Sequence, residues 1–110
     1  MAWDPSVADT LRAALAGRDG VAERRMFGAL CFMARGNMLC GALADGGFFR
    51  VGKAGEAAAL ALPGVRPMTM AGGRPMPGIV RAPLEAVADP ALRGRLLALA
   101  EGCVGGLPAK

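Results

Sequence analysis

The pattern of apolar and polar positions predicts a helix near each end of the chain. Asp4-Pro5 is a typical helix start, because aspartate accepts hydrogen bonds from free N–H groups and proline fits the first turn. Gly17 can end that helix in a left-handed conformation, and Asp89-Pro90 repeats the start signal further on. Apolar residues recur at helical spacing after each start. The first set is Val7, Leu11, Ala14 and Leu15, and the second is Leu92, Leu96, Leu99 and Cys103. We expect the second set to cover a sheet.

Short apolar runs separated by glycine-rich turns predict strands in the first half of the chain. We expect strands over residues 21–27, 29–34, 38–44 and 48–51, of which the last three segments are apolar runs. The turns between them contain Gly28, Arg35-Gly36-Asn37 and Asp45-Gly46-Gly47. Tight turns of this kind join antiparallel neighbours, so we expect a meander.

The four phenylalanines, which are Phe27, Phe32, Phe48 and Phe49, lie in or beside these strands. We expect most of their rings to be buried between sheet and helices. Phe48 and Phe49 are adjacent, so their side chains must point to opposite faces of the sheet. One of them is therefore a candidate for a second core or an interface. Methionines fill irregular cores or line adaptable binding surfaces, and core packing is favoured for these: Met26, Met33, Met38, Met68, Met70 and Met76.

The second half of the chain predicts another helix and another hairpin. Residues 53–62 are rich in alanine and favour a helix, which Pro63-Gly64 ends. Arg66-Pro67-Met68 and Arg74-Pro75-Met76 then flank Ala71-Gly72-Gly73. This echo predicts a hairpin whose prolines confine it to edge positions, with the returning strand continuing over residues 78–82.

The order of these segments is helix, four strands, helix, two strands, helix. It predicts a two-layer α+β domain with an antiparallel sheet of five to six strands flanked by helices. A chain of 110 residues is long enough for one such domain, which we assign to residues 1–110 with an irregular tail at 104–110. No apolar run approaches the roughly 20 residues of a membrane span, and the first nine residues carry no basic segment. We therefore expect a cytoplasmic protein with no membrane partner.

Charge favours a solvated surface over a phosphate-binding face. The formal net charge is +4, with 11 arginines and 2 lysines scattered along the chain. The adjacent basic pair Arg24-Arg25 follows Glu23, tyrosine is absent, and Trp3 is the one tryptophan. Domains that bind nucleic acid usually combine a basic stripe with several stacking aromatics.

The chemistry of an active site is missing from the sequence. The chain has no histidine, the usual general base at neutral pH and the commonest metal ligand, and its one serine, Ser6, falls in the first helical turn. The acidic residues form no cluster, and no phosphate-binding loop motif occurs. We expect no catalysis, no metal and no cofactor.

The three cysteines, Cys31, Cys40 and Cys103, are typical of a reducing compartment, because their number is odd and their spacing wide. Buried structural thiols are the favoured interpretation. If Arg35-Gly36 is a two-residue loop, Cys31 faces Cys40 across the hairpin, which leaves a redox pair open as the alternative.

From Arg24 onward the sequence resembles the N-terminal domain of the TfoX/Sxy family of bacterial competence regulators. The resemblance rests on these segments: Arg25-Met26-Phe27-Gly28, Phe32, Gly36-Asn37-Met38, Cys40-Gly41, Arg50-Val51-Gly52, Arg66-Pro67-Met68, Gly73-Arg74-Pro75-Met76 and Leu107-Pro108-x-Lys110. It implies an antiparallel sheet flanked by helices, similar to the type III secretion chaperone fold, which often dimerises. It also implies a link to the regulation of DNA uptake through transcription.

Two functional hypotheses follow. The leading one is a non-enzymatic regulatory module that binds a protein, such as a transcription factor or polymerase component, with these candidate contacts: Arg25, Phe27, Arg50, Lys53, Arg66 and Arg74. The alternative is direct nucleic-acid binding through Arg24 and the basic residues of that set. An undiscovered enzyme or small-ligand binder is a weaker third reading.

Two structural expectations accompany the leading hypothesis. An open sheet face would need cover, so we expect a homodimer. Arg25 and Arg50 are expected on strands that are close in the sheet order, where they would share a structural role or bind a carboxylate of the partner.

Overall fold

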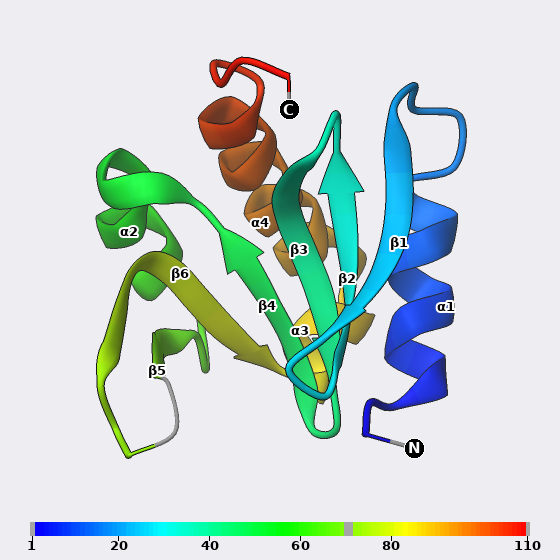
Figure 1. The fold of residues 1–110 in the computed structure, drawn as a ribbon. Helices are drawn as coiled ribbons and strands as arrows, with labels where there is room; N and C mark the ends of the chain where they lie inside the picture. Colours follow the sequence, from blue (N-terminus) through cyan, green and yellow to red (C-terminus); the bar gives the residue numbers. More distant parts are fainter. Residues whose placement is uncertain (1, 70–71, 110) are drawn as a thin grey trace.

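A six-stranded antiparallel sheet carries four helices on one face (Figure 1). The computed structural model describes residues 2–69 and 72–109. The strand order is β1-β2-β3-β4-β6-β5, and every neighbouring pair is antiparallel. The α+β fold class is therefore confirmed. Along the chain the elements are α1 (Pro5–Ala14), β1 (Val21–Met26), β2 (Ala29–Ala34), β3 (Asn37–Leu43), β4 (Gly46–Arg50), α2 (Gly52–Leu60), β5 (Arg66–Thr69), β6 (Pro75–Pro83), α3 (Leu84–Ala88) and α4 (Pro90–Val104).

Both helix starts predicted from aspartate and proline are confirmed. The Asp4 carboxylate accepts a hydrogen bond from the Ser6 backbone N–H at 2.8 Å. The Asp89 carboxylate accepts from two backbone N–H groups of α4, at 2.9 and 3.3 Å. These bonds satisfy donors that have no partner inside the helix, which fixes where each helix begins.

Replacing Asp89 by alanine should lower the free energy of unfolding by about 1 kcal/mol, because α4 then begins with two unsatisfied N–H groups. Urea denaturation followed by circular dichroism measures the change. Asp19→Ala is the matched control, since this carboxylate lies in an exposed turn outside the sheet and helices. A loss as large for Asp19→Ala would show that charge rather than capping is responsible.

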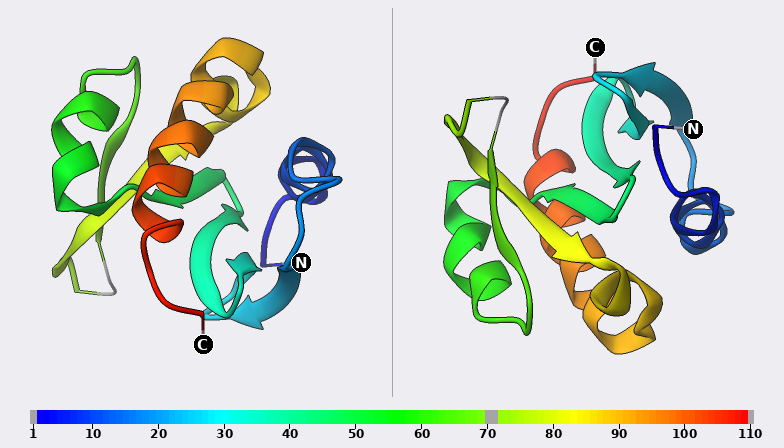
Figure 2. Two further views of the ribbon diagram at one scale, coloured as in Figure 1. Left: turned by 90° about the horizontal axis from the view of Figure 1, so that it is seen from above. Right: turned by 90° about the horizontal axis from the view of Figure 1, so that it is seen from below.

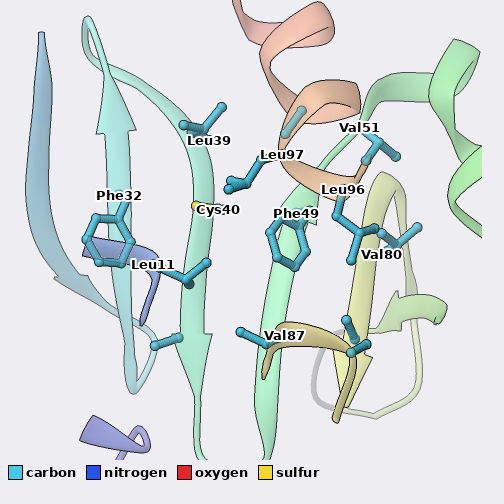
Figure 3. Packing of buried hydrophobic residues seen from close by; sticks show 14 of the residues in the cluster. Leu11, Phe32, Leu39, Cys40, Phe49, Val51, Val80, Val87, Leu96 and Leu97 are labelled. Atoms are coloured by element: carbon cyan, nitrogen blue, oxygen red, sulfur yellow. The ribbon is translucent and has the colours of Figure 1, made fainter. Parts of the chain in front are cut away.

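The main core lies between the sheet and the helices, and all four helices contribute to it. Figure 3 shows its centre, where Phe49 of β4 lies among side chains from β3, β6 and α4. The buried residues of α4 are Leu96, Leu97, Ala100 and Val104.

The predicted apolar face of α4 is therefore rotated, because Leu96 is its one fully buried member. Leu99 and Cys103 approach α2 instead: a Cβ added at Gly55 would lie 3.7 Å from a Leu99 methyl carbon, and one at Gly52 2.9 Å from the Cys103 sulfur. Viewed from above and below, α2 lies beside α4 and β6 (Figure 2). The helix thus packs on two neighbours at once, which widens its apolar surface beyond one stripe.

The second hairpin occupies the edge of the sheet, with β5 outermost. The β6 prolines, Pro75 and Pro77, precede Ile79, the first β6 residue that pairs with β4, so they interrupt no ladder between central strands. Of the turn, Met70 and Ala71 lie outside the described residues. The short helix α3 was not predicted, since five residues are too few to show a helical period.

Candidate binding surface

A second apolar cluster lies on the sheet face opposite the helices, which we call the open face. Four of its residues are buried and five half-buried, and all nine belong to strands. They are Ala29, Cys31, Met33 and Phe48, with Met26, Met38, Leu43, Met68 and Ile79 beside them. No helix residue in the described part of the chain belongs to this cluster. Half-buried apolar side chains gathered on one face of a sheet are typical of an interaction surface.

Phe48 and Gly41 form the centre of the open face. They pair directly across β3 and β4, and a Cβ on Gly41 would overlap the Phe48 ring. The ring therefore lies across the glycine, which keeps it 5% exposed without a helix above it. Phe49, the next residue, is buried in the main core, so the prediction that the two rings point to opposite faces is confirmed.

Four arginines share the open face with this cluster. In register, Arg24 pairs with Cys31, Arg50 with Ile79, and Arg81 with both Phe48 and Arg66. Directly paired residues of antiparallel strands point to the same side of the sheet. The Arg81 guanidinium binds the Asp45 carboxylate at 2.5 Å.

The candidate contacts from the sequence do not form one site. Arg50 and Arg66 are on the open face, while Lys53 is exposed in the first turn of α2 and Arg74 is exposed just before β6. Sequence reasoning missed Arg81, because only the strand order shows that β6 pairs with β4 and places this arginine opposite Phe48.

Arg25 lies on the other side of the sheet, near α1. It pairs with Leu30, a main-core residue, and its guanidinium carbon lies 5.6 Å from the centroid of the Trp3 ring, a cation–π geometry. Strands β2 and β3 separate it from the strand of Arg50. The strands of Arg25 and Arg50 are not close in the sheet order as predicted, since the meander places its first and fourth strands three positions apart. The two side chains also lie on opposite faces of the sheet.

The hollow beside Trp3 has a volume of about 340 Å³, and Arg12, Glu23 and Arg25 are among its lining residues. Arg12 holds both Glu23 oxygens, at 2.6 and 2.8 Å. These hydrogen bonds lower the pKa of the Glu23 carboxyl below its usual value. This carboxylate stays ionised and paired at neutral pH, so it is unsuited to act as a general acid.

Phe27 is fully exposed at the tip of the β1–β2 hairpin. The other three rings, of Phe32, Phe48 and Phe49, are buried, so the expectation that most of the phenylalanines are buried is confirmed. Phe27 has φ 54° and Gly28 has φ 75°, the left-handed pair that a two-residue hairpin turn requires. A bulky residue rarely adopts this conformation, so Phe27 combines backbone strain with an unburied ring.

Replacing Phe27 by asparagine should raise the free energy of unfolding by about 0.5–1 kcal/mol, because Asn-Gly is the preferred pair for this turn. Thermal or urea denaturation measures the gain. Arg35→Asn is the comparison, since Arg35 has φ 51° in the β2–β3 turn and also precedes a glycine. Its gain should be smaller, because the Arg35 guanidinium donates to the Gly105 carbonyl. Lower stability of Phe27→Asn would show that the ring contributes packing.

Cys31 and Cys40 do not lie opposite each other across the β2–β3 hairpin, although the length of its turn predicted that they would. A register shift after Phe32 pairs Cys31 with Gly41 and Cys40 with Phe32. Cys31 lies in the open-face cluster and Cys40 in the main core, on opposite sides of the sheet. Burial raises the pKa of Cys31, and it raises that of Cys40 to about 12, with Cys31 adding to the shift. Both thiols stay protonated at neutral pH, and a protonated thiol is a poor nucleophile.

The family model of the TfoX N-terminal domain matches residues 13–103 of this chain. The chain belongs to the TfoX N-terminal domain family. The resemblance seen in the sequence motifs is thereby confirmed. The match ends one residue before the end of α4 and covers all six strands. No curated protein and no solved structure matches the chain. Among the residues described, no helix is long and apolar enough to cross a membrane.

Proposed function

We propose that this domain is a non-enzymatic regulatory module that binds a protein partner through the open face of its sheet. The observation that carries the proposal is the apolar cluster around Phe48, whose nine members all come from strands. Helix α2 borders the cluster at one end, where Glu56 and Leu60 line a hollow with Met68 and Ile79. The five half-buried residues of the cluster still expose apolar surface. Burying such surface contributes about 25 cal/mol per Å², so contact with a partner protein here is stabilising. Membership of the TfoX N-terminal domain family supports a regulatory role, and we propose a cytoplasmic partner from the transcription machinery.

The side chains of the open face suit a protein partner. Four of the nine cluster residues are methionines, whose flexible thioethers adapt to partner side chains of varied shape. The buried thiols are protonated and Glu23 is held by Arg12, so the titratable groups with shifted pKa values offer no nucleophile or general acid. These features support binding rather than catalysis.

Direct nucleic-acid binding is the second candidate, and the arginines of the open face favour it. Their guanidinium groups suit phosphate as well as carboxylate. Contacts with phosphate weaken steeply as salt rises, whereas an apolar protein interface does not. Binding that falls by orders of magnitude between 50 and 200 mM salt, roughly the range in which phosphate contacts are lost, would support this candidate.

A comparative pull-down from native cytoplasm tests the proposal. The bait is wild-type protein or the double variant Met38→Gln/Met68→Gln, which places amides in two half-buried positions of the cluster. Met76→Gln is the matched control, because Met76 is half-buried in the same sheet but outside the cluster. We expect the double variant to lose an identified partner that the wild type and the control retain. If the folded double variant still retains this partner, the proposal is overturned.

A further inference from the structure

The charge of the open face points to the chemistry of the partner, and this inference rests on the proposed function. Four arginines share the face with the apolar cluster, and the one acidic side chain shown to bind any of them is Asp45, which holds Arg81. Arg24, Arg50 and Arg66 form no ion pair with another described residue. Of the seven arginines elsewhere, four are held by acidic side chains or backbone carbonyls of the chain, namely Arg12, Arg18, Arg35 and Arg93. Arg25 lies over Trp3, and Arg74 and Arg95 are exposed. The open face therefore offers three unused guanidinium groups beside apolar side chains.

The spacing of the arginines suits an α-helix. Arg24 is on β1 and Arg50 on β4, three strand positions apart, which is roughly 14 Å across the sheet at about 4.8 Å per strand. The register row of Arg24 reaches β4 at Phe48, so Arg50 lies two residues further along, roughly 7 Å at about 3.4 Å per residue. An α-helix with its side chains is about 10–12 Å wide. Between the two arginines lie Cys31, Met33, Met38 and Phe48, all members of the open-face cluster. A helix placed on this strip would bury an apolar face and present side chains from both flanks to guanidinium groups.

We infer that the open face binds an acidic amphipathic helix of a partner protein. The apolar side of that helix packs on the half-buried methionines Met26, Met38 and Met68. Glutamate or aspartate side chains on its flanks bind Arg24 and Arg50. Paired guanidinium and carboxylate groups form charge-assisted hydrogen bonds that also fix the orientation of the helix.

A second copy of this chain fits the open face less well. Face-to-face association would bring the four open-face arginines of each copy together. The carboxylate of Asp45, which could offset this charge, already binds Arg81. Like charges placed opposite one another oppose association. Nucleic acid is also disfavoured, because the one aromatic ring of the cluster, Phe48, is 5% exposed and cannot stack on a base.

Methyl NMR of the full chain with labelled methionines tests the inference. The probes are three synthetic peptides: an acidic amphipathic helix, the same apolar sequence with lysine for each glutamate, and an acidic scramble without an apolar face. We expect the first peptide alone to shift the methyl signals of Met26, Met33, Met38 and Met68, while Met76 outside the cluster stays in place. Equal shifts with the lysine peptide or the scramble, or no shift with any peptide, would overturn the inference.

Charge reversal supplies the second readout. Arg24→Glu/Arg50→Glu should weaken binding of the acidic peptide about tenfold or more, since it replaces two attractions by two repulsions. Arg74→Glu/Arg95→Glu is the matched control with the same change in net charge at two exposed positions, before β6 and on α4. Equal weakening in both variants would show a general effect of charge and overturn the assigned contacts.

Failure here is distinguishable from failure of the proposed function. A native partner that is lost with Met38→Gln/Met68→Gln but retained by Arg24→Glu/Arg50→Glu supports protein binding and overturns the acidic helix. If the methyl signals shift with protein concentration alone, the open face binds a second copy of the chain and the inference is overturned. If a DNA oligonucleotide shifts them more strongly than the acidic peptide does, the face binds nucleic acid and the inference is likewise overturned.

Discussion

Alanine in place of Phe49 is expected to lower the free energy of unfolding by about 3–5 kcal/mol. The Phe49 side chain is 0% exposed at the centre of the main core. It pairs in register with Cys40 of β3 and Val80 of β6, and Leu96 and Leu97 of α4 lie nearby (Figure 3). Truncation leaves a cavity bounded by two strands and a helix, which cannot all move inward together. Domains of this size are stable by about 5–15 kcal/mol, so part of the variant should be unfolded at 37 °C.

Phe48→Ala is the matched comparison for Phe49→Ala. The two residues are adjacent on β4 and almost equally buried, but no described helix residue packs in the cluster of Phe48. The neighbouring methionines can therefore adjust, and we expect a smaller loss in urea denaturation together with weaker binding of the partner. A loss from Phe48→Ala equal to that from Phe49→Ala would contradict the description of the open face as adaptable.

Local signals predict this fold well where a turn or a cap leaves little choice. Glycine-rich turns divide the first four strands, and the prolines of the second hairpin place it at the edge. The capping carboxylates mark the starts of α1 and α4. In each case a few adjacent residues determine the backbone, so no knowledge of distant contacts is needed.

Features that depend on register or on distant strands could not be predicted. The bulge after Phe32 inserts one residue into β3 and moves Cys40 to the face opposite Cys31, and nothing in the residue types marks it. Residue type favours burial of all four phenylalanines equally, and it is the hairpin turn that places the Phe27 ring in solvent.

The sequence predicted that the sheet has a second apolar face but not which residues form it. Adjacent Phe48 and Phe49 required a second apolar surface, but its arginines come from four strands whose order includes the insertion of β6 between β4 and β5. Pairing between strands distant in sequence decides which arginines share a face, and a single sequence does not record that pairing.

Gly46→Ala is expected to destabilise the domain by about 2–3 kcal/mol. Gly46 pairs with Pro83 where β4 meets β6. A Cβ at Gly46 would overlap the Ala82 carbonyl oxygen and lie 3.1 Å from the carbonyl carbon. These are backbone atoms of β6, so no side-chain rotation relieves the overlap and the two strands must separate at this end.

Gly94→Ala is the control for Gly46→Ala, because it makes the same chemical change without a clash. Gly94 lies inside α4, it is exposed, and an added Cβ meets nothing within 4 Å. Alanine there should raise the free energy of unfolding by about 1 kcal/mol, the usual difference in helix propensity. The two variants should therefore move in opposite directions in urea denaturation. Wild-type stability of Gly46→Ala would show that β6 does not approach β4 at this residue, and the order of strands that brings Arg81 to Phe48 would then be wrong.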